Sequence, residues 1–243
     1  MIDYSLFTNP GGRDNNEDFV GVTKHGEDYC FVLCDGLGGH DRGEVASKMV
    51  AENILRMFEA EGDSEGFLDR AMTKSQNDLL ELQRQEHLED AMKTTAVVLV
   101  VTTEYIKWAH IGDSRLYHFF DNGTRYERTR DHSLVQMLVD TGEIKDEEIR
   151  VHPDRNKVFR VMGAEWGVKS YDKSAILERE NGHSFLLMTD GFWEYVQESE
   201  MIQYLASSAT SEEWLANMEI LVRQRADMSK TDNYSAIAVR ILN

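Results

Sequence analysis

Short runs of apolar and β-branched residues predict eight β-strands, because such residues favour the pleated, half-buried surface of a sheet. Asp121-Asn122-Gly123, directly after one of these runs, is a turn signal, since Asn and Gly tolerate a positive φ. The predicted strands cover about residues 18–23, 29–35, 95–103, 106–112, 115–120, 171–177, 184–189 and 234–242.

Apolar residues at helical spacing predict four helices between these strands. In the first, Ala46, Val50 and Ile54 lie on one face. The predicted helices cover residues 44–60, 65–88, 134–141 and 211–225.

The order of the elements indicates the fold class. Strands that follow one another after short turns pair in antiparallel fashion, and an alternating βαβ pattern is absent. We therefore expect an α+β fold in which helices cover two antiparallel sheets. The composition shows no linker and no repeat, which predicts a single domain over residues 1–243. The highly charged segment 140–166 is expected to form a mobile surface flap.

Composition and charge exclude several classes of protein. Of the 243 residues, 41% are hydrophobic and 29% are charged, which is typical of a globular chain. Apolar runs fall far short of the roughly 20 residues that a membrane span needs, and no secretory signal is expected. The 44 acidic residues outweigh the 26 basic ones, giving a net charge of −18. This balance argues against nucleic acid or a membrane as the partner.

The two cysteines, Cys30 and Cys34, lie in one predicted buried strand. Four residues of strand span roughly 13 Å, too far for a disulfide. Neither cysteine has a CxxC partner, so a zinc site is not expected. We interpret them as reduced core thiols, which favours a cytoplasmic location.

Five aspartates stand at the ends of predicted strands. A single such aspartate is ordinary, because aspartate caps helices and starts turns. Five of them suggest carboxylates that converge at one rim of a sheet, where they repel one another unless they share protons or bind metal. Their oxygen atoms suit Mg²⁺, Mn²⁺ or Ca²⁺. These residues are Asp18, Asp35, Asp113, Asp190 and Asp232.

Three rival motifs fail on the residues that they require. An EF-hand loop beginning at Asp14 would place Phe19 where Gly is needed and His25 where Glu is needed. A nucleophile elbow around Ser114 would have Leu116 in place of its last Gly. The glycine-rich stretch at 36–39 lacks the Lys-Ser or Lys-Thr of a P-loop.

Taken in order, the chain resembles the metal-dependent protein serine/threonine phosphatases of type 2C, or PPM family, in their compact bacterial form. The resemblance extends over nearly the whole chain. The matching stretches are Arg13-Asp14-Asn15-Asn16-Glu17-Asp18, Asp35-Gly36-Leu37-Gly38-Gly39-His40, Lys93-Thr94-Thr95-Ala96, Gly112-Asp113-Ser114-Arg115, Asp131-His132-Ser133, Thr189-Asp190-Gly191 and Thr231-Asp232-Asn233.

The resemblance implies a four-layer α-β-β-α sandwich and a role for each matching residue. Two Mn²⁺ or Mg²⁺ ions would activate a water molecule that attacks the phosphate. Arg13 would bind the substrate phosphate, Glu17 would orient waters on the ions, and Asp113 would hold a third, weaker ion with help from Asp190. The ligands of the two main ions would be Asp18, Asp35, Asp190 and Asp232 with the backbone carbonyl of Gly36.

One position departs from the family. Some relatives have a histidine after the Asp-Gly pair that is proposed to protonate the leaving group, and this chain has Leu37. His40 follows three residues later. It is either an ordinary loop or helix-start histidine or a substitute for the missing acid. A water on the metal ions is the alternative source of the proton.

The resemblance thus predicts a phosphatase acting on phosphoserine and phosphothreonine in proteins, with a cognate serine/threonine kinase as its functional partner. A non-catalytic module that binds phosphoproteins is the rival from another class. A regulator acting through an anti-sigma-type partner is a further alternative. The complete set of aspartates favours the enzyme.

Overall fold

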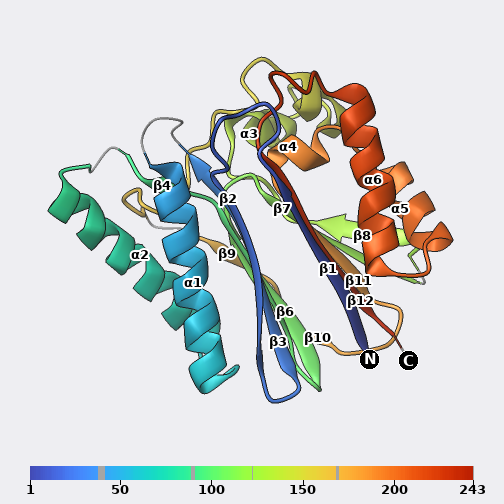
Figure 1. Cartoon of the computed structure of the whole chain (residues 1–243), viewed down its shortest axis with the longest axis horizontal. Helices are drawn as coiled ribbons and strands as arrows, with labels where there is room; N and C mark the ends of the chain where they lie inside the picture. Colours follow the sequence, from blue (N-terminus) through green and yellow to red (C-terminus); the bar gives the residue numbers. More distant parts are fainter. Residues whose placement is uncertain (38–41, 89–90, 122, 168–169, 243) are drawn as a thin grey trace.

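The computed structural model describes residues 1–37, 42–88, 91–121, 123–167 and 170–242. Two antiparallel sheets lie face to face, with helices on both outer surfaces (Figure 1). Helices α1 (Gly43–Glu61) and α2 (Phe67–Glu86) cover one sheet, and α5 (Glu198–Ser207) and α6 (Ser211–Arg225) cover the other. The predicted four-layer α+β sandwich is confirmed.

The first sheet has five strands in the order β1-β12-β11-β7-β8. Its edge strands are the two that the hydrophobic pattern did not reveal, β1 and β8. The bounds are β1 Ile2–Asn9, β7 Arg115–Phe120, β8 Arg125–Arg128, β11 Ser184–Met188 and β12 Tyr234–Ile241.

The second sheet has seven strands, with the path β10-β6-β5-β3-β2 and two short additions, β4 beside β3 and β9 beside β6. The chain passes from this sheet to the first between β6 and β7, through residues 112–114. The bounds are β2 Asp18–His25, β3 Asp28–Leu37, β4 Lys93–Thr94, β5 Ala96–Val101, β6 Tyr105–Ile111, β9 Asp172–Lys173 and β10 Leu177–Glu178.

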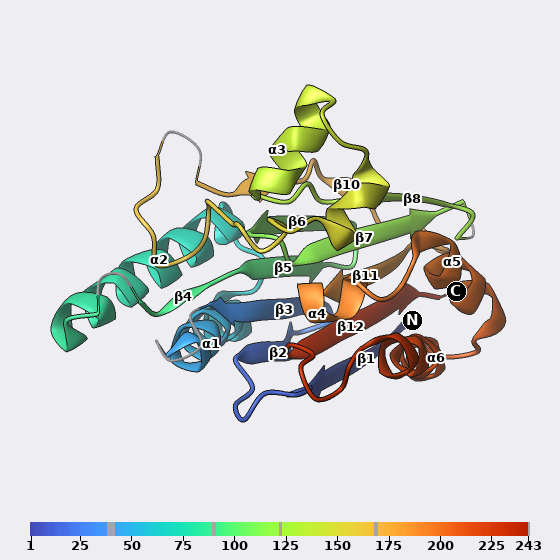
Figure 2. The same ribbon diagram turned by 90° about the horizontal axis from the view of Figure 1, so that it is seen from above.

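The shorter helices lie near one end of the sandwich, where α3 projects above the sheets in Figure 2. α3 begins after Ser133, whose hydroxyl accepts the backbone N–H of Gln136 and caps the helix. These elements are α3 (Leu134–Thr141), the 3₁₀ helix η1 (Asp146–Val151) and α4 (Asp190–Trp193).

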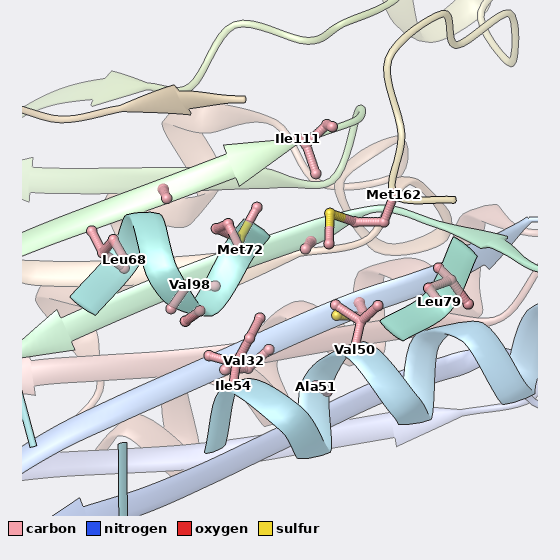
Figure 3. Packing of buried hydrophobic residues seen from close by; sticks show 14 of the residues in the cluster. Val32, Val50, Ala51, Ile54, Leu68, Met72, Leu79, Val98, Ile111 and Met162 are labelled. Carbon is pink, nitrogen blue, oxygen red and sulfur yellow. The ribbon is translucent and has the colours of Figure 1, made fainter. Parts of the chain in front are cut away.

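Three apolar clusters hold the layers together. One fills the space between the sheets and includes Leu33 and Ile237. A second lies between α5, α6 and the five-stranded sheet, around Trp214. In the third, Val50 and Ile54 of α1 pack with α2 on the outer face of the seven-stranded sheet (Figure 3). Burial of this apolar surface is the main stabilising contribution to such a fold.

Cys30 and Cys34 are both buried and unpaired, as predicted. Within the described ranges, no helix combines the length and the apolar character that crossing a membrane requires.

Segment 140–166 is more firmly anchored than its charge suggested. Ile149 and Arg150 of η1 are buried, and the Arg150 guanidinium donates to the carbonyls of Trp193 and Val196. Met162, near the other end of the segment, belongs to the core beneath α1 and α2. The segment therefore contains buried residues among its charged ones, and Arg150 can be buried because its donors are satisfied. That the segment is a mobile surface flap stays a prediction.

Candidate active site

One end of the sandwich carries an acidic cleft of about 460 Å³. The seven-stranded sheet contributes carboxylates from the ends of β2 and β3, and the other sheet contributes them just after β11 and just before β12. The lining includes Arg13, Glu17, Asp35, Gly36, Asp113, Asp190 and Asp232. Asp18 is the partner of Asp35 in the β2–β3 register. The predicted site residues are thus brought together from distant parts of the chain.

Asp18 is held by groups of the opposite sheet. The hydroxyl of Thr189 donates to its Oδ2 at 3.0 Å, while the N–H of Ser235 donates to the same threonine oxygen at 2.9 Å. Its other oxygen, Oδ1, is buried and has no hydrogen-bond partner among the described residues. A buried acceptor without a partner is costly, so this oxygen is suited to a ligand.

Asp35 is fixed through its backbone. Its N–H donates to the Thr95 hydroxyl at 3.0 Å, and its carbonyl accepts the Thr94 hydroxyl at 2.8 Å. The next residue, Gly36, has no room for a side chain, because a Cβ would lie 2.4 Å from the Gly43 backbone. Glycine at position 36 is therefore required by close packing of β3 against the start of α1.

Asp113 lies in the turn that connects β6 of one sheet to β7 of the other and is only 4% exposed. Its carbonyl accepts the indole N–H of Trp193 at 3.1 Å. The Trp193 ring packs under the Arg115 guanidinium, which makes two hydrogen bonds to Asp131. The buried pair thus holds the turn that carries Asp113.

Crowding of the carboxylates shifts their pKa values upward. Burial, with repulsion from Asp190 and Asp232, raises the pKa of Asp18 to about 7. Burial and the charge of Asp232 raise the pKa of Asp190 to about 6. Burial and the neighbouring carboxylates place the pKa values of Asp35 and Asp113 well above their ordinary range. The cleft therefore favours positive charge, from protons or from cations.

Arg13 lies at the mouth of the cleft. Its Nη2 is 2.9 Å from Oδ2 of Asp232, and the two side chains are 54% and 47% exposed. The ion pair therefore joins Arg13 to a candidate metal ligand. An exposed pair of this kind is weak, so the guanidinium can exchange partners at little cost.

Segment 140–166 borders the cleft through Asn156 and Val158. Next to them, Arg155 forms an ion pair at 2.6 Å with Glu194. Burial and the charge of Asp190 raise the pKa of Glu194 to about 7. The ion pair ties the segment to α4, the helix that begins with Asp190.

The family model for protein phosphatase 2C matches residues 12–226. The chain belongs to this family. The predicted family and the predicted class of enzyme, a protein serine/threonine phosphatase, are therefore confirmed at the level of the family.

Several relatives match this chain over almost their full length. The protein phosphatase PhpP of Streptococcus pneumoniae is 30% identical over 247 residues, covering 98% of this chain and 97% of PhpP. The structure of the serine/threonine phosphatase Stp1 of Staphylococcus aureus superposes with a TM-score of 0.86 at 33% identity, covering 100% of this chain and 96% of Stp1. The catalytic domain of the phosphatase PstP, in complex with 2 manganese ions, gives a TM-score of 0.82 at 27% identity, covering 100% and 99%.

Sequence reasoning missed the residues that position the carboxylates. Asn233 is one of them: its Oδ1 accepts the N–H of Glu17 at 2.7 Å, and its amide donates to the carbonyls of Pro10 and Asn15. It thereby holds the loop that carries Arg13. A signal was available, because Thr94, Thr95, Thr189 and Asn233 all belong to the quoted family motifs. Leu37 lines the cleft, and His40 lies outside the described residues.

Proposed function

We propose that this chain hydrolyses phosphoserine and phosphothreonine in proteins at a centre of two divalent cations, Mn²⁺ or Mg²⁺, in the acidic cleft. Asp113 would contribute to a third, weaker site. The observation that carries the proposal is the buried Oδ1 of Asp18, which lacks a hydrogen-bond partner among the described residues. The proposed ligands of the two ions are Asp18, Asp35, Asp190, Asp232 and the carbonyl of Gly36.

The donor set fits such ions on chemical grounds. All the proposed donors are oxygen atoms, which Mg²⁺ and Mn²⁺ prefer, and the cleft lining includes neither histidine nor cysteine among the described residues. The raised pKa values of Asp18 and Asp190 reflect burial and mutual repulsion, which bound cations would relieve. The two manganese ions of the PstP catalytic domain support the same assignment.

When bound, the ions would activate a water molecule and neutralise the phosphoryl oxygens. The residues of the chain supply position and charge around them. Thr189 keeps the Asp18 carboxylate in one orientation, and Thr95 does the same for the backbone of Asp35. Rigid placement of this kind is what lowers the cost of reaching the transition state.

Arg13 would bind the substrate. A phosphomonoester carries up to two negative charges, and a guanidinium can donate two parallel hydrogen bonds to its oxygens. Arg13 would exchange Asp232 for the phosphate once that carboxylate is occupied by a cation. Glu17 lines the same cleft and would accept hydrogen bonds from waters in it.

No protein nucleophile is needed for this reaction. Among the described residues that line the cleft there is no Ser, Thr or Cys. This composition argues against a phosphoserine, phosphothreonine or phosphocysteine intermediate and supports direct attack by water. Segment 140–166 would contact the substrate through Asn156 and Val158, as a mobile flap of a single catalytic domain over residues 1–243.

The enzyme would reverse the action of a serine/threonine kinase in the cytoplasm by dephosphorylating the proteins that the kinase phosphorylates. The buried, unpaired Cys30 and Cys34 support a reducing compartment. A regulator that acts through an anti-sigma-type partner would use the same site. The identity of its phosphorylated substrates separates these two roles.

Hydrolysis of p-nitrophenyl phosphate and of a phosphothreonine peptide, measured with Mn²⁺, with Mg²⁺ and with EDTA, tests the proposal. We expect turnover with either ion and none with EDTA. Asp232→Asn should abolish most of the turnover, whereas Asp69→Asn, a distant change of the same type, should leave it intact. Binding of the phosphopeptide without any hydrolysis would favour the non-catalytic module instead.

A further inference from the structure

A second cavity, of about 470 Å³, lies away from the acidic cleft, at the far end of the first sheet. Its lining includes two imidazoles, His118 of β7 and His183 just before β11. β11 runs from this cavity to the cleft, so that His183 and Asp190 are separated by seven residues, or roughly 20 Å of extended chain. The two sites are therefore distinct.

The imidazoles belong to a hydrogen-bonded chain that begins at a carboxylate. Nδ1 of His118 is 3.0 Å from Oε1 of Glu127, and Nε2 of His118 is 2.8 Å from Nδ1 of His183. An ionised carboxylate can only accept, so Nδ1 of His118 carries the proton and its Nε2 has a free lone pair. In the metal-free protein, Nδ1–H of His183 donates to that lone pair.

The His118 ring is held rigidly by aromatic neighbours. It stacks on Phe185 with a centroid distance of 4.8 Å and an interplanar angle of 11°. The ring centroids of Trp108 and Phe120 lie 5.9 and 5.2 Å from the centroid of the His118 ring. Burial lowers the pKa values of both His118 and His183, so both rings are neutral at neutral pH. Neutral, fixed imidazoles are good metal ligands.

We propose that this cavity binds one transition-metal ion of the Zn²⁺ or Ni²⁺ class through Nε2 of His118 and Nδ1 of His183. The proton of His183 would move from Nδ1 to Nε2, and the ion would lie to one side of the line between the two nitrogens. With metal–nitrogen distances of about 2.0–2.1 Å and a tetrahedral angle at the ion, the nitrogens would stand roughly 3.3 Å apart, so the two rings would have to move apart from their present 2.8 Å.

The surroundings favour a cation at this point. Glu127 supplies the carboxylate partner that ligating histidines commonly have. Glu180 also lines the cavity and acts electrostatically on His183, so its negative charge favours a cation nearby. Nη1 of Arg125 forms an ion pair with Oδ2 of Asp121 at 3.3 Å. This pairing weakens the electrostatic repulsion between Arg125 and a cation in the cavity.

A second group with metal-ligating side chains, His110, His132 and Asp172, fits less well. Nδ1 of His132 accepts the N–H of Gly112, and its Nε2 donates to Asp172. The guanidinium of Arg160 already lies 3.7 Å from Asp172. A cation there would be repelled, so this group is better interpreted as a closed hydrogen-bond network.

Calorimetric titration with Ni²⁺ in millimolar Mg²⁺ tests the proposal, because Mg²⁺ competes for the oxygen ligands of the cleft and hardly for imidazoles. We expect His183→Asn to bind one Ni²⁺ fewer than the wild type, or to bind it at least about tenfold more weakly. The matched control is His25→Asn, an exposed histidine on another edge, which should titrate like the wild type. Equal stoichiometry and affinity in wild type and His183→Asn would overturn the inference.

Electron paramagnetic resonance of the wild type with one equivalent of Cu²⁺, again in Mg²⁺, gives a second test that needs no variant. Two imidazole ligands should produce nitrogen superhyperfine splitting, which the all-oxygen cleft cannot produce. A spectrum with oxygen ligation only would overturn the inference. Neither measurement depends on phosphatase activity, so failure here leaves the proposed function untouched.

Discussion

Replacing Asp190 by Asn should make the metal-free protein more stable and at the same time nearly inactive. Asp190 lies among carboxylates that repel it, and its pKa is raised from 3.8 to about 6. The folded state therefore keeps a proton that the unfolded chain has already lost. Stability falls as the pH rises between these two values, and the penalty is complete above them.

The size of the gain follows from the shift. Two pKa units correspond to about 3 kcal/mol, and because neighbouring carboxylates share the shift we expect a gain of about 1–3 kcal/mol at pH 8. For a chain of this size that is roughly 3–9 °C in melting temperature. Asn keeps the shape: its Oδ1 can still accept the Gly191 N–H, at 2.6 Å in the wild type, and its amide can donate to Asp35.

Thermal unfolding in EDTA at pH 4 and at pH 8 measures the effect. The variant should melt above the wild type at pH 8 and close to it at pH 4, while its Mn²⁺-dependent turnover falls at least roughly 10²-fold. Asp69→Asn is the opposite control, because contacts with Lys173 and Tyr171 lower the pKa of Asp69 and its loss should reduce stability. A variant that melts at or below the wild type at pH 8, or turns over at the wild-type rate, would refute the reasoning.

Three further predictions concern the same cleft. The chelated protein should stay folded and Mn²⁺ should raise its melting temperature, by about 2.7 kcal/mol of stability at a hundred times the dissociation constant; a melting curve indifferent to millimolar Mn²⁺ would contradict a preformed site. Arg13→Ala should raise KM for a phosphopeptide and Arg13→Lys should restore only part of the loss, since an ammonium cannot make the bidentate contact; unchanged steady-state kinetics would return Arg13 to a surface ion pair. Thr189→Val should weaken Mn²⁺ binding about 10- to 100-fold, because Asp18 loses a hydrogen bond, and Thr189→Ser should retain most of it; equal Mn²⁺ titrations for Val and Ser would show that the hydroxyl is dispensable.

The central strands and the long helices could be predicted because each buries a continuous apolar face. The edge strands could not: β8 is Arg-Tyr-Glu-Arg, mostly exposed, and is held by backbone pairing to β7. The predicted strand at 171–177 is two short strands, because the Ser174 hydroxyl accepts the N–H of Trp108 between them. α5 was also missed, although Gln197 and Glu200 form a capping box at its start.

The carboxylates of the site were predictable because five aspartates at the ends of apolar runs, each ordinary alone, together suggest a shared site. Their partners were harder to foresee. The pair of Arg13 and Asp232 joins residues 219 positions apart, and local sequence contains no trace of it. Thr189 and Asn233 act through hydrogen bonds across the fold, which composition and periodicity do not reveal.

The cleft lies at the seam between two sheets, so its shape depends on how far apart the sheets stand. Asp18 and Asp35 move with one sheet, Asp190 and Asp232 with the other. A change of side-chain volume in the layer between them, at Leu33 or Ile237 for example, would alter the spacing of all four without touching any. Substitutions inside the core would thus tune the affinity of the proposed metal centre, and Mn²⁺ affinities measured across a library of core variants would report on the separation of the two sheets.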